Sequence, residues 1–249
     1  MTRQKILITG ASSGLGAGMA RAFAADGRDL ALCARRTDRL DELKAELTAS
    51  HPDIQVAVAE LDVNDHEQVP KVFAELSDQL GGIDRVIVNA GIGKGWPLGG
   101  GKLWANKATI ETNLVAALVQ IETAIEMFQK SGSGHLVLIS SVAANKGVPG
   151  IKAAYSASKA GVSSLGMSLR AQFLKGPIKI TVLEPGYIES EMTAKAQNTM
   201  LMIDNEAGVK ALVNAIERER GYAVVPAWPW LPLVALMKVV PPRLAKLFA

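Results

Sequence analysis

Residues 9–16 of the chain read Thr-Gly-Ala-Ser-Ser-Gly-Leu-Gly, and this stretch decides the fold. Its three glycines, Gly10, Gly14 and Gly16, follow the short apolar run Ile6–Ile8 and precede a helical pattern of apolar residues. The glycines are therefore expected to form a turn between a strand and a helix. Such a turn can hold a phosphate over the helix N-terminus, whose free N–H groups attract anions. The spacing G-x-x-x-G-x-G differs from the G-x-G-x-x-G fingerprint, so a purely structural turn is the alternative.

Short apolar runs alternate with longer amphipathic segments along the whole chain. The runs expected to be strands are Ile6–Ile8, Leu30–Cys33, Val56–Leu61, Val86–Val88, Leu136–Ile139, Ile180–Leu183 and Ala223–Val225. The amphipathic segments between them include Leu40–Ala49, Val69–Leu80 and Lys107–Phe128. This alternation predicts an α/β fold, a doubly wound parallel sheet of about seven strands with helices on both faces. Since no linker or repeat interrupts it, residues 1–249 are expected to form one domain, ending in an apolar tail at residues 226–249.

Composition narrows the classes of protein and of partner. Hydrophobic residues make up 49% of the 249 residues and charged residues 20%, as in a folded globular chain. The net charge of +3 is too small to predict a nucleic-acid partner. The single cysteine, Cys33, fits a reducing compartment, and the N-terminus lacks the pattern of a signal peptide, so a cytoplasmic location is expected. The three histidines lack the spacing of metal ligands, and no metal site is predicted.

Four further motifs fall at the ends of predicted strands or just beyond them. Val88–Gly91 (VNAG) closes the fourth strand, Leu138–Ser141 (LISS) closes the fifth, Tyr155–Lys159 (YSASK) opens a helical pattern, and Glu184–Ser190 (EPGYIES) follows the sixth strand. Ligands of open α/β sheets bind beyond the carboxyl ends of the strands. Together with residues 9–16, these motifs resemble the short-chain dehydrogenase/reductase family over nearly the whole chain. The resemblance implies a Rossmann-like fold and an oxidoreductase that uses a nicotinamide cofactor.

The resemblance implies four catalytic residues for hydride transfer between nicotinamide and a carbonyl or secondary alcohol. Tyr155 matches the family's general acid and base, and Lys159, four residues on and so on the same helical face, would lower its pKa and hold the nicotinamide ribose. Ser141 matches the serine that hydrogen-bonds the reacting oxygen, and its neighbour Ser140 is the structural competitor. Asn113 matches the asparagine that holds a water in a proton relay, and a hydrogen bond within helix packing is the alternative role for it.

The end of the second predicted strand indicates which cofactor is used. An NAD-preferring site has an acidic residue about 20 residues past the glycine turn, where it bonds the ribose 2′-hydroxyl. Ala34 takes that position here, and Arg35 and Arg36 follow it. Guanidinium groups can hold a 2′-phosphate, so NADP(H) is predicted to be preferred over NAD(H). The alternative is that both arginines only begin the solvated face of the next helix. The cofactor residues implied by the resemblance are Gly10, Ser12, Ser13, Gly14, Leu15, Gly16, Arg35, Arg36, Asp62, Val63, Asn89, Ala90, Gly91, Tyr155, Lys159, Pro185, Gly186, Ile188 and Ser190.

The sequence is less specific about substrate and assembly. A small hydrophobic carbonyl or alcohol is expected, because flexible apolar residues follow the sixth strand. Candidate pocket residues are Met192, Met200, Leu201, Met202, Trp96, Val148 and Tyr187, and the alternative for each is a place in the hydrophobic core. Related proteins pair the helices that correspond here to Lys107–Phe128 and to the helix beginning near Tyr155, which implies a homodimer or homotetramer. A catalytically silent NADP-binding regulator or scaffold on the same fold is the alternative function.

The C-terminal tail leaves two interpretations open. Its charged side chains, Lys238, Arg243 and Lys246, are all basic, and Trp228 and Trp230 lie near its start. Its uncharged run is shorter than the ~20 residues of a membrane-spanning helix and contains several prolines. The tail either folds over the substrate pocket or a subunit interface, or it makes peripheral contact with a membrane.

Overall fold

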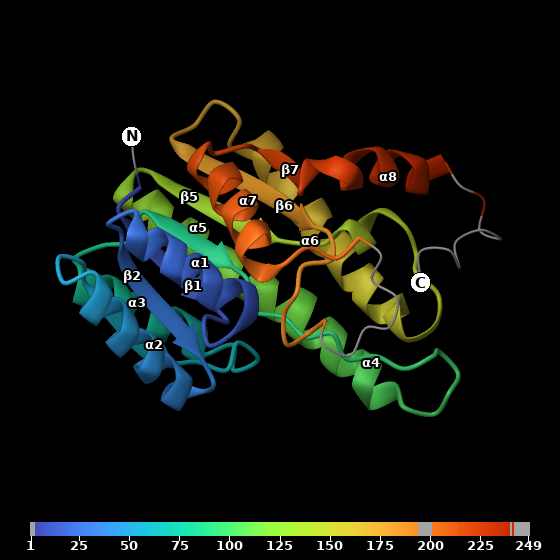
Figure 1. Cartoon of the computed structure of the whole chain (residues 1–249), viewed down its shortest axis with the longest axis horizontal. Helices are drawn as coiled ribbons and strands as arrows, with labels where there is room; N and C mark the ends of the chain where they lie inside the picture. The colour runs from blue at the N-terminus through green and yellow to red at the C-terminus, as the bar shows by residue number, and fades with distance from the viewer. Residues whose placement is uncertain (1–2, 194–200, 240, 242–249) are drawn as a thin grey trace.

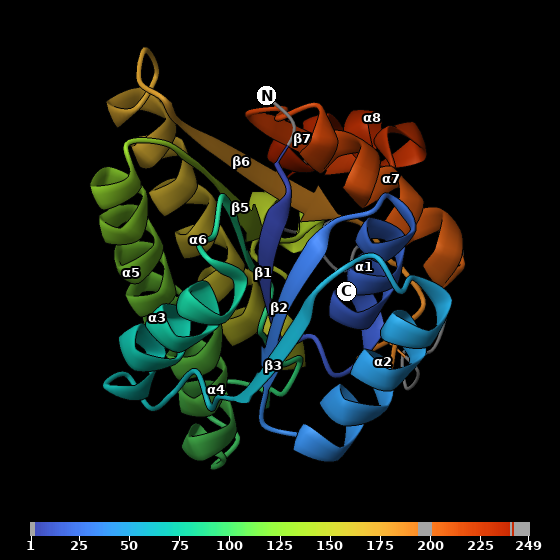
Figure 2. The same cartoon turned by 90° about the vertical axis from the view of Figure 1, so that its left-hand side faces the viewer.

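A single seven-stranded parallel sheet forms the centre of the molecule (Figures 1 and 2). The computed structural model describes residues 3–193, 201–239 and 241. The strands are β1 (Lys5–Thr9), β2 (Asp29–Ala34), β3 (Val56–Glu60), β4 (Arg85–Val88), β5 (Gly134–Ile139), β6 (Ile178–Pro185) and β7 (Tyr222–Val225). Their order in the sheet is β3-β2-β1-β4-β5-β6-β7. Successive strands are thus added on one side of β1 up to β3 and on its other side from β4 onward. The predicted Rossmann-like fold class is confirmed.

Helices cover both faces of the sheet. They are α1 (Gly14–Ala25), α2 (Thr37–Ser50), α3 (Gln68–Leu80), α4 (Leu103–Ile110), α5 (Ala116–Ser131), α6 (Ala153–Gln172), α7 (Asn205–Glu217) and α8 (Ala227–Val239), with a π-helical turn η1 (Glu111–Val115) and two 3₁₀ turns, η2 (Val142–Asn145) and η3 (Gly150–Lys152). The helices α1, α2 and α7 share one hydrophobic core with the sheet, and α3, α5 and α6 share the other. Figure 2 shows the two groups on opposite sides of the strands.

Alternating side chains of each central strand enter the two cores. In β1, Ile6 and Ile8 pack with α1, α2 and α7, whereas Leu7 packs on the opposite face. In β2, Leu32 and Cys33 divide between the faces in the same way. Both faces must therefore be apolar, which explains why the strands read as continuous hydrophobic runs in the sequence.

A buried ionic cluster joins the amino ends of the strands to the end of α7. Arg85, at the start of β4, is 1% exposed, and its Nη1 donates to Glu217 Oε1 at 2.6 Å. Its Nε donates to His135 Nδ1 at 2.9 Å, so His135 donates from Nε2 to Thr181 Oγ1 at 2.8 Å. Burial lowers the pKa of His135 well below its usual value, which keeps the ring neutral. We call these four residues the amino-edge cluster.

Candidate active site

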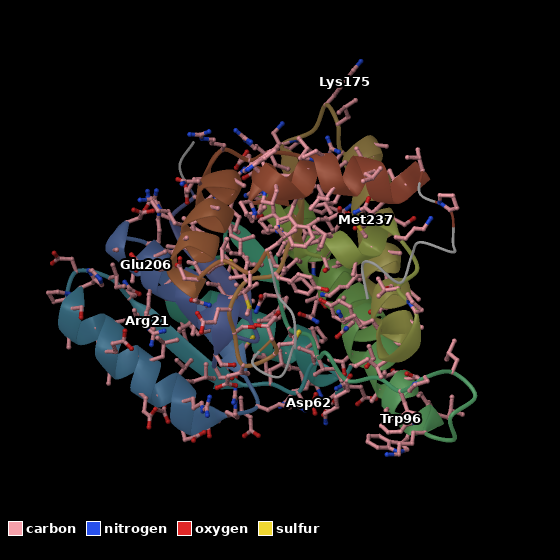
Figure 3. All side chains as sticks on the ribbon, turned by 45° about the vertical axis from the view of Figure 1, so that its right-hand side comes forward. Arg21, Asp62, Trp96, Lys175, Glu206 and Met237 are labelled. Carbon is pink, nitrogen blue, oxygen red and sulfur yellow. The ribbon has the colours of Figure 1, made fainter. Side chains whose placement is uncertain are left out.

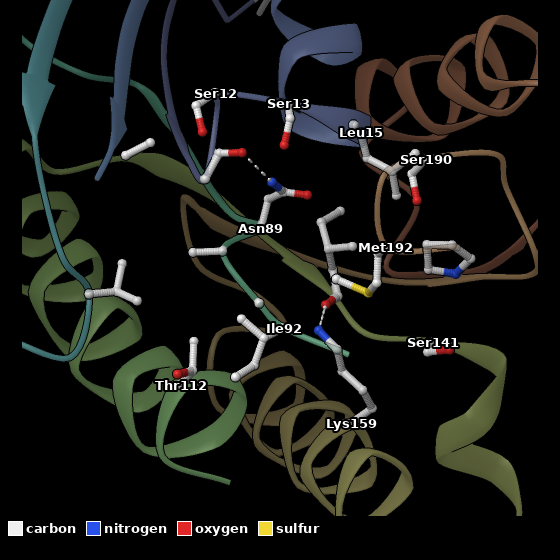
Figure 4. Close-up of a pocket in the computed structure, with 18 of the residues that line it drawn as sticks. Ser12, Ser13, Leu15, Asn89, Ile92, Thr112, Ser141, Lys159, Ser190 and Met192 are labelled. Atoms are coloured by element: carbon white, nitrogen blue, oxygen red, sulfur yellow. Dashed lines mark hydrogen bonds between the residues drawn. The ribbon is translucent and has the colours of Figure 1, made fainter. Parts of the chain in front are cut away.

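One pocket at the carboxyl ends of the strands gathers residues from all five sequence motifs (Figure 4). Every predicted cofactor residue except Gly16 lines it, and so do the predicted catalytic residues Ser141, Tyr155 and Lys159. The wall also includes Leu61, Asn64, Ile92, Thr112, Ile139 and Thr193, which the sequence analysis did not single out. Each of these lies within three residues of a predicted site residue in the sequence. This closeness was the sequence feature from which their place in the wall could have been predicted.

The glycine turn brings the backbone of β1 close to that of β4. Gly10 has φ +66°, and a Cβ on it would lie 2.9 Å from the Cα of Ala90. A Cβ on Gly16 would lie 2.3 Å from the carbonyl oxygen of Gly10, so Gly16 serves the packing of the turn rather than the pocket wall. Asn89 Nδ2 donates to the Thr9 carbonyl at 2.9 Å and holds the end of β4 against the turn. The turn is thus a rigid cradle over the start of α1, a geometry that suits a pyrophosphate.

Arg36 bends back onto the glycine turn. Its Nε donates to Ser12 Oγ at 3.2 Å and its Nη2 donates to Ser13 Oγ at 2.6 Å. Its Nη1 donates to Glu191 Oε2 at 3.1 Å, and Arg39 pairs with the same carboxylate. Arg35 is exposed and lines the pocket beside it. The guanidinium group of Arg36 therefore lies at the glycine turn instead of pointing away into solvent along α2.

Ser141, Tyr155 and Lys159 converge from β5 and α6. Ser141 begins the turn η2, where its Oγ accepts from the backbone N–H of Ala143 at 3.2 Å. Lys159 is 6% exposed, and its Nζ donates to the carbonyl of Ile139 at 2.8 Å (Figure 4). That Nζ lies 6.0 Å from the centre of the Tyr155 ring. The three side chains thus approach the pocket from two adjacent elements.

The pKa values of Tyr155 and Lys159 both reflect their burial. Burial raises the pKa of Tyr155, and a hydrogen bond with Ser141 opposes that rise. Burial also lowers the pKa of Lys159 to about 8. The physical reason is that a low-dielectric site disfavours the phenolate and the ammonium alike, and that Lys159 points its ammonium at a backbone carbonyl. The pKa of Tyr155 is therefore raised in this structure, because burial outweighs the hydrogen bond with Ser141.

A buried carboxylate that the sequence analysis missed supports the site. Glu184 is 2% exposed and accepts from Ser163 Oγ at 2.8 Å, from Tyr222 OH at 2.6 Å and from Asn145 Nδ2. Ser163 Oγ in turn bonds Ser140 Oγ at 2.8 Å. Glu184 thereby links α6, β7 and η2 around Ser141. Its sequence signals were its place as the first residue of the motif Glu184–Ser190 and its acidic side chain directly after the apolar pair Val182 and Leu183.

Asn113 lies outside the pocket wall and makes packing hydrogen bonds. It is 1% exposed within the π-helical turn η1. Its Oδ1 accepts from the N–H of Ile92 at 2.8 Å, and its Nδ2 donates to the carbonyl of Ile92 at 2.9 Å and to Ser158 Oγ at 3.3 Å. The segment Lys107–Phe128 is not one regular helix, because the chain passes from α4 through the π-helical turn η1 into α5. π-Helical turns are frequent at functional sites.

Of the predicted substrate residues that the structure describes, Met192 alone lines the pocket. Met192 lines the pocket and is half exposed, and Tyr187 OH accepts from Lys152 Nζ at 2.8 Å. The Tyr187 ring also packs edge-on against Trp230 of α8, at 5.4 Å between centroids. Val148 is buried, whereas Trp96 is 38% exposed and its Nε1 donates to the Gly100 carbonyl. Leu201 and Met202 are half-buried, and Met200 lies outside the described residues.

Comparison with known proteins identifies the family. A sequence model described as short chain dehydrogenase matches residues 4–201. The chain belongs to the short-chain dehydrogenase family. It is 79% identical, over all 249 residues and 98% of the relative, to an uncharacterized oxidoreductase of Mycobacterium tuberculosis (strain ATCC 25618 / H37Rv). An uncharacterized oxidoreductase of Myxococcus xanthus (strain DK1622) is 33% identical over 99% of this chain and 93% of the relative.

Solved structures of the short-chain dehydrogenase fold are similar to this one. The NADPH-dependent 3-quinuclidinone reductase of Rhodotorula rubra matches with a TM-score of 0.80 and 26% identity, covering 90% of each chain. A short chain dehydrogenase/reductase of Burkholderia phymatum in complex with NAD matches with a TM-score of 0.83 and 21% identity, covering 94% of this chain and 92% of that one. This protein is therefore an oxidoreductase of the short-chain dehydrogenase family, whose fold binds nicotinamide cofactors.

Proposed function

We propose that the protein is a cytoplasmic, NADP(H)-dependent oxidoreductase that interconverts a carbonyl and a secondary alcohol of a small hydrophobic substrate. The observation that carries the proposal is the convergence of Ser141, Tyr155 and Lys159 in the pocket whose other end is the glycine turn. The tight cradle formed by Gly10 and Ala90 supports the fit of a dinucleotide at that end.

The proposed cofactor site runs along the carboxyl ends of the strands. The turn Gly10–Gly16 would hold the pyrophosphate, and Arg35 and Arg36 would hold the 2′-phosphate. Asp62, with Val63 beside it, would bond the adenine, and Asn89–Gly91 would line the adenosine side. The nicotinamide end would rest on Pro185, Gly186, Ile188 and Ser190. When bound there, the cofactor supplies the hydride.

The protein's own residues would place the carbonyl and move the proton. Ser141 Oγ would donate a hydrogen bond to the substrate oxygen, and Tyr155 OH would donate its proton to the same oxygen as negative charge develops on it. The raised pKa of Tyr155 keeps its hydroxyl protonated at neutral pH, which suits the acid role in reduction. Lys159 would hold the nicotinamide ribose hydroxyls. Asn113 Oδ1 accepts one hydrogen bond from Ile92, and its second lone pair would hold the relay water that resupplies the proton.

Replacement of Arg36 tests the cofactor preference. Arg36→Ala should weaken NADPH binding about tenfold to a hundredfold and leave NADH binding nearly unchanged, since only NADPH carries the phosphate that a charged hydrogen bond would hold. Arg35→Ala should act in the same direction. Arg21→Ala is the matched control, because Arg21 pairs with Glu46 away from the pocket. Fluorescence titration with both cofactors is the measurement, and equal losses for NADPH and NADH would contradict the 2′-phosphate assignment.

We propose a homodimer or homotetramer that pairs α5 and α6 across a two-fold axis. Leu118 on α5 and Met167 on α6 are 44% and 46% exposed, which leaves apolar surface on both helices for a partner copy. Light scattering at micromolar protein concentration should give at least the mass of a dimer. A monomeric mass would count against this assembly.

The alternative function is a catalytically silent NADP-binding regulator or scaffold. Such a protein would not need a group that donates and accepts a proton in the pocket. This chain has Ser141, Tyr155 and Lys159 there. A screen of carbonyls and alcohols with NADPH and NADP⁺ separates the two functions, because only the enzyme turns over.

A further inference from the structure

Large apolar side chains are exposed at the end of the molecule that carries the pocket. Leu103 and Trp104 at the start of α4 are 76% and 64% exposed, and Leu98 in the preceding loop is 73% exposed. Ile151 in η3 is 55% exposed, and Leu231 and Leu236 on α8 are 53% and 50% exposed. We call these six residues the apolar rim. Figure 1 shows α4 and α8 at the same end of the molecule, toward which the strands point.

Each segment of the apolar rim contacts another rim segment or an element next to the pocket. A Cβ on Gly95 would lie 1.9 Å from the Ile151 carbonyl oxygen, so the loop before α4 touches η3. The helix α8 packs against η2, the turn that Ser141 begins. Met192, which lines the pocket, lies against Gly93 of the same loop. The apolar rim therefore lies on segments that adjoin the pocket.

The outward face of α8 lacks the polar side chains of an ordinary surface helix. Trp230, Val234 and Met237 are buried against the body of the protein. On the outside, Leu231 and Leu236 are joined by exposed Ala235 and Val239, with Lys238 as the charged residue among them. A helix that is apolar on both faces needs a second apolar environment.

The charge distribution indicates which environment suits this end. Residues 85–110, 127–183 and 220–249, which supply the whole apolar rim, contain no Asp or Glu, although the chain has 24 acidic residues. The loop and helix from Lys94 to Lys107 carry three lysines, and Lys152 and Lys238 adjoin the other two segments. Trp96, Trp104 and Trp228 are exposed in the same segments, whereas Trp230 is buried. Exposed tryptophan and leucine with basic residues and no acidic ones complement an anionic lipid surface.

We propose that the apolar rim docks the protein on the surface of an anionic phospholipid bilayer, with the mouth of the pocket facing the lipid. No helix among the described residues has the length and hydropathy to cross a bilayer, so the contact is peripheral. On the proposed function, the substrates would be carbonyl or alcohol lipids that enter the pocket from the membrane.

Vesicle binding of the full chain tests the docking. The protein should sediment with vesicles of phosphatidylglycerol and phosphatidylcholine at low salt, and much less with phosphatidylcholine alone or at high salt. Tryptophan emission should shift to shorter wavelength on binding, and Trp104→Phe and Trp228→Phe should each reduce the shift. An absence of binding to the anionic vesicles at low salt would overturn the proposal.

Matched leucine variants locate the contact. Leu103→Glu and Leu231→Glu should each weaken vesicle partitioning about tenfold or more, because each replaces a membrane-buried leucine with a charge. Leu174→Glu is the control, since Leu174 is 71% exposed but follows the far end of α6, whose 20 residues span about 30 Å. Figure 3 shows its neighbour Lys175 at the opposite end from Trp96. Equal losses in all three variants would contradict docking through the rim.

Two further measurements distinguish membrane docking from an interface between copies of the chain, and from a failure of the proposed enzymatic function. Light scattering without vesicles should give the same mass for wild type and Leu231→Glu. If Leu231→Glu causes an oligomer to dissociate and the wild-type protein does not bind vesicles, the apolar rim is an interface between copies of this chain and the proposal fails. Reduction of a small water-soluble ketone without vesicles should be unchanged in Leu231→Glu, so a failure of docking is distinguishable from a failure of the proposed enzymatic function.

Discussion

Tyr155→Phe should lower the turnover number by about a hundredfold to ten-thousandfold, the usual contribution of a positioned general acid. The substitution removes one hydroxyl and keeps the ring, so NADPH binding should stay near that of wild type. Stopped-flow or steady-state reduction of a carbonyl substrate, combined with fluorescence titration of NADPH, measures both quantities. The separation of the two effects is what identifies the hydroxyl as the proton donor.

The other tyrosines supply a control for this substitution. Tyr222→Phe also removes a hydrogen-bonded hydroxyl, which in the half-buried Tyr222 donates to Glu184 at 2.6 Å. It should lower the melting temperature, because Glu184 loses a hydrogen bond, while most of the turnover remains. If Tyr155→Phe kept substantial activity with a ketone, Tyr155 would not be the acid.

Lys159→Met should impair both cofactor binding and turnover. The loss of charged hydrogen bonds to the ribose hydroxyls should weaken NADPH binding about tenfold to a hundredfold. Turnover at saturating NADPH should fall by about a hundredfold, because the nicotinamide that Lys159 would position through the ribose is no longer held in line with Tyr155. A variant with normal NADPH affinity would contradict the ribose role, and Lys152→Met, which alters a lysine outside the pocket wall, is the matched control.

The same variant should change how stability depends on pH. Burial lowers the pKa of Lys159 to about 8 from its usual 10.5, so between these pH values the unfolded chain binds more protons at this site than the folded chain. The free energy of unfolding of wild type should therefore rise through that window, by on the order of 2–3 kcal/mol from this group. Lys159→Met should lack the rise, and denaturant titrations at pH 7.5 and 10 would reveal the difference; parallel pH curves would contradict it.

The fold could be predicted from sequence because both faces of the sheet are covered. Each strand then reads as a short apolar run, and all seven predicted runs lie within or overlap the observed strands. The break within Lys107–Phe128 could not be predicted in this way. The turn η1 depends on hydrogen bonds between Asn113 and the backbone of Ile92, which is 21 residues away, and periodicity is insensitive to such contacts.

The sequence motifs predicted which residues line the pocket, but they did not predict which hydrogen bonds and ion pairs those residues make. Strand-end motifs bring residues together because parallel strands end at one edge. The contacts of Arg36 with Ser12 and Ser13, and its pairing with Glu191, join segments distant in sequence. The environment of Glu184 and the raised pKa of Tyr155 likewise depend on burial, and the neighbours of Glu184 come together only when α6 and β7 pack against β6.

The amino-edge cluster has a consequence for how such a protein can evolve. Because all strands run the same way, Arg85, His135 and Glu217 hold the helix-to-strand connections together, whereas the pocket is built from strand-to-helix connections at the opposite edge. Substitutions that change substrate preference fall in the strand-to-helix loops, and the ionic contacts that oppose unfolding lie at the helix-to-strand loops. Selection for a new substrate and selection for heat tolerance can therefore proceed on separate residues, which makes this architecture readily evolvable.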